Sequence, residues 1–124
     1  MKILIDSANI DDIKKIYEFF PIDGVTTNPS ILLKERVDPY KQLKKIYEFL
    51  KLQSNYELHV QVYSEKKEEI IKEAYEIKSS FGEKCFIKVP VNLEGLAAIK
   101  TLAKENFNIT ATAIYSHEQA FLAA

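Results

Sequence analysis

The sequence is poor in cysteine and glycine and has neither a strong charge excess nor a long apolar run. Its single cysteine excludes an intrachain disulfide framework and agrees with a reducing compartment, so we expect a cytoplasmic protein. The apolar runs reach about five residues, whereas a membrane-spanning helix needs roughly 20. A net charge of −1 gives no electrostatic basis for binding nucleic acid or a membrane surface.

What the sequence does contain is a regular alternation of two apolar patterns. Short β-branched runs predict strands, and apolar residues three or four apart predict helices. The expected strands cover residues 2–6, 22–26, 58–62, 85–89 and 107–112. The expected helices cover about 10–20, 40–50, 64–81 and 92–105, and a fifth begins at the capping box of residues 116–119.

Five βα repeats in succession imply a parallel sheet covered by helices. An open doubly wound sheet and a closed barrel share that order, but two features favour the barrel. Each repeat takes about 20 to 35 residues, near the ~30 of a (β/α)8 barrel. No glycine-rich G-x-G-x-x-G turn marks a dinucleotide crevice. We therefore predict an α/β fold of the parallel (β/α)8 TIM-barrel type, with the first five βα units present.

The last residues of the chain bear on its domain organisation. The fifth helical segment has a start signal and then runs through residues 120–124 without a C-cap or a stop. Five strands cannot close a small barrel, and both outer strands would keep unpaired edges. We expect residues 1–124 to be the N-terminal part of a single barrel domain, truncated in its fifth helix. The alternatives are a non-catalytic half-barrel that folds only by self-association, and an open α/β binding module related by topology alone.

Polar side chains stand at the carboxyl ends of all five expected strands. They are Asp6, Thr26 with Asn28 just beyond it, Gln61, Lys88 and Thr112. In a parallel barrel these ends line one mouth, which is where active sites are built. One acid, one lysine and several neutral hydrogen-bonding groups suit carbonyl chemistry. The set lacks the imidazoles and thiols that metal or thiol chemistry would need.

Each of these residues has a structural alternative when it is taken alone. Asp6 could cap the first helix, and residues 26–30 are good turn and cap chemistry. Lys88 could extend its ammonium into water, but its inward strand neighbour is Phe86 and apolar residues follow it. An ammonium held among apolar groups has a lowered pKa, and a neutral amine attacks carbonyls. Five such positions on one face favour a functional site.

Two segments carry a resemblance to a known family. They are Gly-Val-Thr-Thr-Asn-Pro-Ser-Ile at 24–31, and Ile-Lys-Val-Pro-Val at 87–91 with Glu-Gly-Leu-Ala-Ala-Ile at 94–99. Both resemble the transaldolase family, most closely its short branch, which includes fructose-6-phosphate aldolase. The resemblance extends from Leu4 to Tyr115 and implies class I aldol chemistry on ketose phosphates, within carbohydrate metabolism and the pentose phosphate pathway.

The resemblance also implies roles for individual residues. Lys88 matches the family's Schiff-base lysine. Asp6 matches the carboxylate that acts in proton transfer and contacts the bound dihydroxyacetone unit. Asn28, with Thr26 beside it, matches an active-site amide that binds the hydroxyls of that unit.

The remaining matched positions concern the proton that moves when the C–C bond breaks. Gln61 and Thr112 match the pair that handles this proton, directly or through a water. Transaldolases typically carry Glu in the place of Gln61 and fructose-6-phosphate aldolases carry Gln, so Gln61 favours the aldolase, which releases free dihydroxyacetone. The protonated imine is the electron sink, so neither a metal nor a cofactor is expected. The expected partners are sugar phosphates and further copies of the chain in a homo-oligomer.

Overall fold

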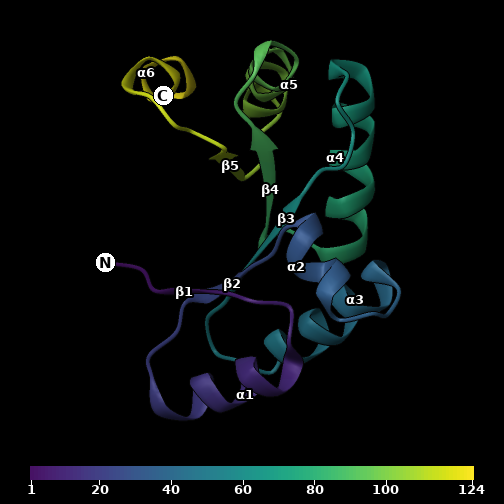
Figure 1. Cartoon of the computed structure of the whole chain (residues 1–124), viewed down its shortest axis with the longest axis vertical. Helices are drawn as coiled ribbons and strands as arrows, with labels where there is room; N and C mark the ends of the chain where they lie inside the picture. Colours follow the sequence, from purple (N-terminus) through teal and green to yellow (C-terminus); the bar gives the residue numbers. More distant parts are fainter. The chain divides into compact units, whose positions relative to one another are not determined.

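Short β-branched segments and amphipathic segments alternate along the chain, and the computed structural model, which describes all residues 1–124, forms strands and helices from them (Figure 1). The fold is α/β, with five parallel strands that alternate with helices. The strands are β1 (Leu4–Asp6), β2 (Gly24–Thr26), β3 (Glu57–Gln61), β4 (Cys85–Pro90) and β5 (Ile109–Thr112). The helices are α1 (Ile10–Phe19), α2 (Pro29–Lys34), α3 (Pro39–Leu50), α4 (Lys67–Phe81), α5 (Leu93–Lys104) and α6 (His117–Ala123). No helix combines the length and the apolar character needed to cross a membrane.

The structure confirms the order of elements and changes two boundaries that matter for the site. The segment after β2, expected to be a turn with a cap, continues into the short helix α2, with Asn28 as its N-cap. The helix expected to begin at residue 64 begins at Lys67. Residues between β3 and α4 therefore form a longer loop than the sequence pattern predicts.

Residues Met1–Val60 form one compact unit. Within it β1 pairs with β2 and β2 pairs with β3, both in parallel. Gly24 is required at the start of β2, because a Cβ there would lie 2.3 Å from the backbone oxygen of Glu57. The core of this unit is formed by fully buried aliphatic side chains from strands and helices alike: Ile13, Val25, Leu32, Ile46, Leu50 and Leu58.

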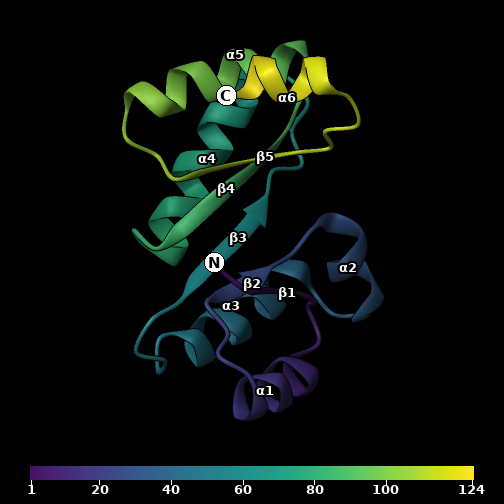
Figure 2. The same ribbon diagram turned by 90° about the vertical axis from the view of Figure 1, so that its left-hand side faces the viewer.

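Residues Gln61–Ala124 form the second unit. Here β4 pairs in parallel with β5, and α4 and α5 pack against each other and against β4 (Figures 1 and 2). The short helix α6 lies beside α5 in both views and buries none of its residues. The core of this unit is formed by Ile70, Ala74, Phe81, Ile87, Val89, Ala98 and Leu102.

Candidate active site

The carboxyl ends of β1 and β2 bring two of the expected residues into one row. Asp6 is the register partner of Thr26, and Thr26 is the register partner of His59 in β3. Register partners in a parallel pair point to the same face, and neighbouring strands lie about 4.8 Å apart. Asp6, Thr26 and His59 therefore form a row of polar side chains on one face of the first unit.

The possibility that Asp6 caps the first helix is wrong. The N-cap of α1 is Asn9, whose side chain accepts hydrogen bonds from the backbone N–H groups of Asp11 at 3.1 Å and Asp12 at 3.0 Å. Asp6 lies three residues earlier, at the end of β1, and is exposed. Its carboxylate is not used to start the helix, so it is accessible to a ligand at the strand end.

The turn after β2 is held by its own side chains. Thr27 is completely buried and donates two hydrogen bonds to the carbonyl oxygen of His59, from its backbone N–H at 3.0 Å and from its hydroxyl at 3.1 Å. Asn28 Oδ1 accepts from the backbone N–H of Ile31 at 3.0 Å. Asn28 is therefore the N-cap of α2, and its NH2 group is the part that can donate to a ligand hydroxyl.

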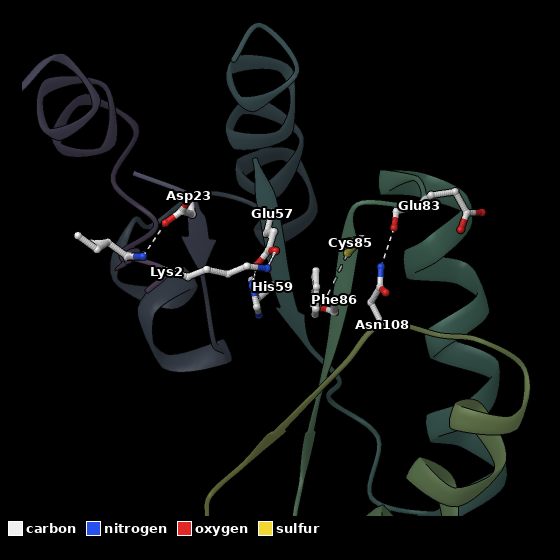
Figure 3. A network of polar contacts seen from close by, with 9 residues as sticks. Lys2, Asp23, Glu57, His59, Glu83, Cys85, Phe86 and Asn108 are labelled. Atoms are coloured by element: carbon white, nitrogen blue, oxygen red, sulfur yellow. Dashed lines mark hydrogen bonds and ion pairs between the residues drawn. The ribbon is translucent and has the colours of Figure 1, made fainter. Parts of the chain in front are cut away.

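His59 is a polar residue of this face that the sequence analysis did not select. It is 5% exposed, and its Nε2 lies 3.4 Å from Glu57 Oε2. The other carboxylate oxygen of Glu57 pairs with Lys2, so one carboxylate joins a buried imidazole to a surface ammonium (Figure 3). The available signal was spacing, because His59 precedes Gln61 by two residues and therefore shares its strand face.

Lys88 lies within β4 in the second unit and is 8% exposed. Its strand neighbours Ile87 and Val89 are completely buried. Its carbonyl oxygen accepts from the backbone N–H of Val62 at 3.1 Å, and its register partner in β5 is Thr110. Lys88 is thus a buried residue of a buried strand segment.

Gln61 and Thr112 are the last residues of β3 and β5, the strands that come before and after the Lys88 strand in the sequence. Gln61 is half-buried at the end of β3, next to the residue that bonds to the Lys88 carbonyl. Thr112 is the register partner of Pro90, two residues beyond Lys88. Ala113 directly after it has a φ of 56°, a left-handed conformation that costs a non-glycine residue about 1–2 kcal/mol.

Two carboxylates that the sequence did not distinguish from solvated helix charges hold the loop after Gln61. Glu73 accepts from the backbone N–H groups of Tyr63 at 2.8 Å and Ser64 at 2.9 Å. Glu94 accepts from the backbone N–H of Lys67 at 2.7 Å. The Glu94 bond satisfies a donor at the start of α4, which has no side-chain cap of its own, and the Glu73 bonds satisfy two donors of the loop before it.

The end of β4 is fixed by a close approach of α5. A Cβ on Gly95 would lie 1.9 Å from the carbonyl oxygen of Pro90, so only glycine allows the first turn of α5 to reach the strand end. Asn92 caps this helix by accepting from the backbone N–H of Gly95 at 2.8 Å. The glycine of the second sequence motif therefore has a packing role next to the strand of Lys88.

The second unit also holds the one cysteine of the chain. Cys85 is 4% exposed, and burial raises the pKa of its thiol to about 12. It is therefore a protonated thiol at neutral pH and cannot act as a nucleophile. The structure places no group of three or more His, Cys, Asp and Glu side chains where they could hold a metal ion.

Comparison with known proteins identifies the family. The family profile described as Transaldolase/Fructose-6-phosphate aldolase matches residues 3–124, almost the whole chain. The chain belongs to the transaldolase/fructose-6-phosphate aldolase family. The five parallel strands and their helices are consistent with part of the TIM barrel of this family.

Relatives in the transaldolase/fructose-6-phosphate aldolase family carry both names. A probable fructose-6-phosphate aldolase from Streptococcus pneumoniae is 44% identical over 124 residues, which are 99% of this chain and 55% of the relative. A probable transaldolase from Thermodesulfovibrio yellowstonii is 39% identical over the whole chain and 56% of its own length. One from Thermoplasma acidophilum is 40% identical over the whole chain and 55% of its own length. The chain thus spans about half the length of the curated relatives it matches.

Proposed function

We propose that Lys88 forms a Schiff base with the ketone carbon of a ketose phosphate or of dihydroxyacetone. The amine adds to the carbonyl carbon, and loss of water from the carbinolamine leaves a protonated imine that withdraws electrons from the bond to be broken. The observation that carries the proposal is the burial of Lys88 between two completely buried strand residues, within the family motif. The neutral amine is the form of a lysine side chain that adds to a carbonyl carbon.

We assign the other members of the site by the same resemblance. Asp6 transfers a proton and contacts the dihydroxyacetone unit, which its exposed position at the end of β1 supports. Asn28 and Thr26 bind the hydroxyls of that unit. Because Asn28 Oδ1 already caps α2, its NH2 group is the part that donates to a substrate hydroxyl.

Gln61 and Thr112 are proposed to handle the proton that moves during C–C cleavage. An amide can orient a water but cannot take its proton, whereas a carboxylate can do both. Gln61 therefore favours the aldolase reaction, with release of dihydroxyacetone, over transfer of the three-carbon unit to another aldose phosphate.

For the whole protein, we propose sugar phosphates as substrates, a cytoplasmic location and a homo-oligomeric assembly. We also propose that residues 1–124 are the N-terminal part of a single (β/α)8-barrel domain. The chain's span of about 55% of its curated relatives supports this division.

Reductive trapping tests the proposal on the chain itself. The folded chain is incubated with dihydroxyacetone or fructose 6-phosphate and sodium borohydride, and peptide mass spectrometry locates the adduct. We expect one adduct, on Lys88, that disappears in Lys88→Met and persists in Lys100→Met, which removes an exposed lysine of α5. A folded chain without an adduct on Lys88, or equal trapping in Lys88→Met, would overturn the proposal.

A second candidate is a non-catalytic chain that is stabilised by self-association. It is favoured by the exposed apolar side chains around α6, where Tyr115 is 90%, Phe121 84% and Leu122 64% exposed. Size-exclusion chromatography with light scattering over a hundredfold dilution series decides. A soluble, folded monomer at every concentration would contradict this candidate.

A further inference from the structure

Helices α1 and α3 enclose an open groove of about 690 Å³ on the first unit. Its apolar lining comes from Ile10 of α1, from Tyr40 and Phe49 of α3, and from Leu52 just beyond α3. Leu52 is 82% exposed and Tyr40 is half exposed, so these side chains are not part of the core. We call this feature the α1–α3 groove, and its volume lies within the 300–1,000 Å³ typical of ligand cavities.

Most of the charged side chains on the rim of the α1–α3 groove are lysines. Lys14 comes from α1. Lys41, Lys44 and Lys45 come from α3, where Lys41 precedes Lys44 by three residues and Lys45 by four. None of these four lysines forms an ion pair. The one acid of the rim, Glu48, already pairs with Lys51 at 2.8 Å. A chain of net charge −1 thus has a local cluster of unpaired ammonium groups.

We propose that the α1–α3 groove binds an acidic amphipathic helix of a partner protein. The apolar lining receives the apolar face of such a helix, in the helix-in-groove manner of recognition. Its carboxylates pair with the lysines of the rim. The proposal does not depend on the chemistry of Lys88.

A designed peptide tests the groove directly. The probe is a fluorescein-labelled, 15-residue helical peptide with Leu at helical spacing and Glu on its remaining face, and the matched peptide carries Lys in place of Glu. We expect fluorescence anisotropy to show at least about tenfold tighter binding of the acidic peptide, and weaker binding at higher salt. Equal binding of the two peptides, or no binding of the acidic one, would overturn the proposal.

Variants locate the binding on the protein. Lys41→Glu with Lys45→Glu should weaken binding at least about tenfold, whereas Lys100→Glu with Lys104→Glu, the same charge change at the same spacing on α5, should leave it unchanged. An unchanged affinity in the α3 variant would contradict the proposal.

Two further measurements distinguish a partner helix from other possible occupants of the α1–α3 groove. Sedimentation with phosphatidylserine vesicles should show no binding at the concentrations where the peptide binds, and vesicle binding that is lost in the α3 variant would replace the partner helix with a lipid surface. A dimer of the chain that forms through the groove and that the peptide fails to dissociate would also overturn the proposal. Lys88→Met should bind the peptide like the unaltered chain, so a failure of the Schiff-base proposal remains distinguishable.

Discussion

The strands that carry Thr26 and Lys88 are both followed by a helix with an asparagine N-cap, but the surroundings of the two caps differ. In each unit an asparagine after the strand caps the following helix: Asn28 accepts at 3.0 Å and Asn92 at 2.8 Å. Asn28 is half-buried and follows the polar end of β2 by two residues, whereas Asn92 is exposed. The β4 end is instead distinguished by Gly95, which lets the first turn of α5 approach the end of the strand.

This difference teaches that an asparagine cap by itself does not mark a functional site. Capping uses one lone pair of Oδ1 in both residues, so the NH2 group, the part of the amide that can donate, has to be tested separately. Substitutions that keep the cap and remove the amide can separate the two roles. The predictions that follow test the contrast between the strand ends, from the largest expected effect to the smallest.

The largest expected effect concerns how well β4 excludes solvent and reagents from Cys85. Burial raises the pKa of Cys85 from 9.0 to about 12, which lowers its thiolate fraction about a thousandfold at pH 8. We expect iodoacetamide to label Cys85 about a thousandfold more slowly in the folded chain than in urea. An exposed thiol in the first unit, introduced as Val37→Cys in a Cys85→Ala background, should be labelled rapidly. Fast labelling of Cys85 in the folded chain would show that β4 is not closed.

The same pKa shift has a consequence for stability. Because the folded chain holds the thiol proton more tightly, the contribution of Cys85 is complete below pH 9 and is lost as pH rises towards 12. Cys85→Ala should therefore flatten the fall in the free energy of unfolding over that interval, measured by urea titration at several pH values. A fall of equal size in Cys85→Ala would assign it to other groups, among them Tyr17, whose pKa is also raised to about 12.

The next effect tests the glycines at the two strands. A Cβ on Gly95 would meet the Pro90 oxygen at 1.9 Å, and a Cβ on Gly24 would meet the Glu57 oxygen at 2.3 Å. Both neighbours are backbone atoms, so we expect Gly95→Ala and Gly24→Ala to cost about 3 kcal/mol or more each, at the upper end for overpacking. Ala97→Gly in α5 should cost only about 1 kcal/mol in the same urea unfolding measurement. Losses below that control would mean that the strand ends tolerate the extra atom.

The asparagine caps give the third effect and the sharpest contrast. Asn28→Ala and Asn92→Ala should each cost about 1 kcal/mol of unfolding free energy through loss of the cap. Asn28→Ser keeps a capping oxygen but lacks the amide, so it should unfold like the unaltered chain and still trap less dihydroxyacetone on Lys88. Asn92→Ser should change neither property. Unchanged trapping in Asn28→Ser would make Asn28 a cap and nothing more.

The smallest effect concerns Glu57, which joins Lys2 to His59. Lys2 is largely exposed, so Lys2→Ala should change the unfolding free energy by less than about 1 kcal/mol. Glu57→Leu removes the carboxylate that contacts a buried imidazole and should cost about 1–3 kcal/mol. Equal losses in the two variants, measured by urea unfolding, would mean that the His59 contact contributes nothing.

Much of this structure could be predicted from local patterns, and the misses have physical causes. Asp6, Thr26, Gln61 and Thr112 were expected at strand ends and do end their strands, because alternation with a period of two is a local signal. Helix α2 was missed because Pro-Ser after Asn28 is equally good turn chemistry. Glu73 and Glu94 could not be recognised, since the backbone donors that they satisfy lie 9 to 27 residues away.

The sequence by itself determined the alternation of strands and helices, the lysine within an apolar strand and the motifs that identify the family, because each depends on neighbouring residues. The tertiary structure alone decided which side chains meet. Register placed His59 beside Thr26, and close backbone contacts gave Gly24 and Gly95 their roles. It also brought α1 to α3, which leaves four lysines without ion pairs around one groove. These relations join residues far apart in the chain, and no local pattern encodes them.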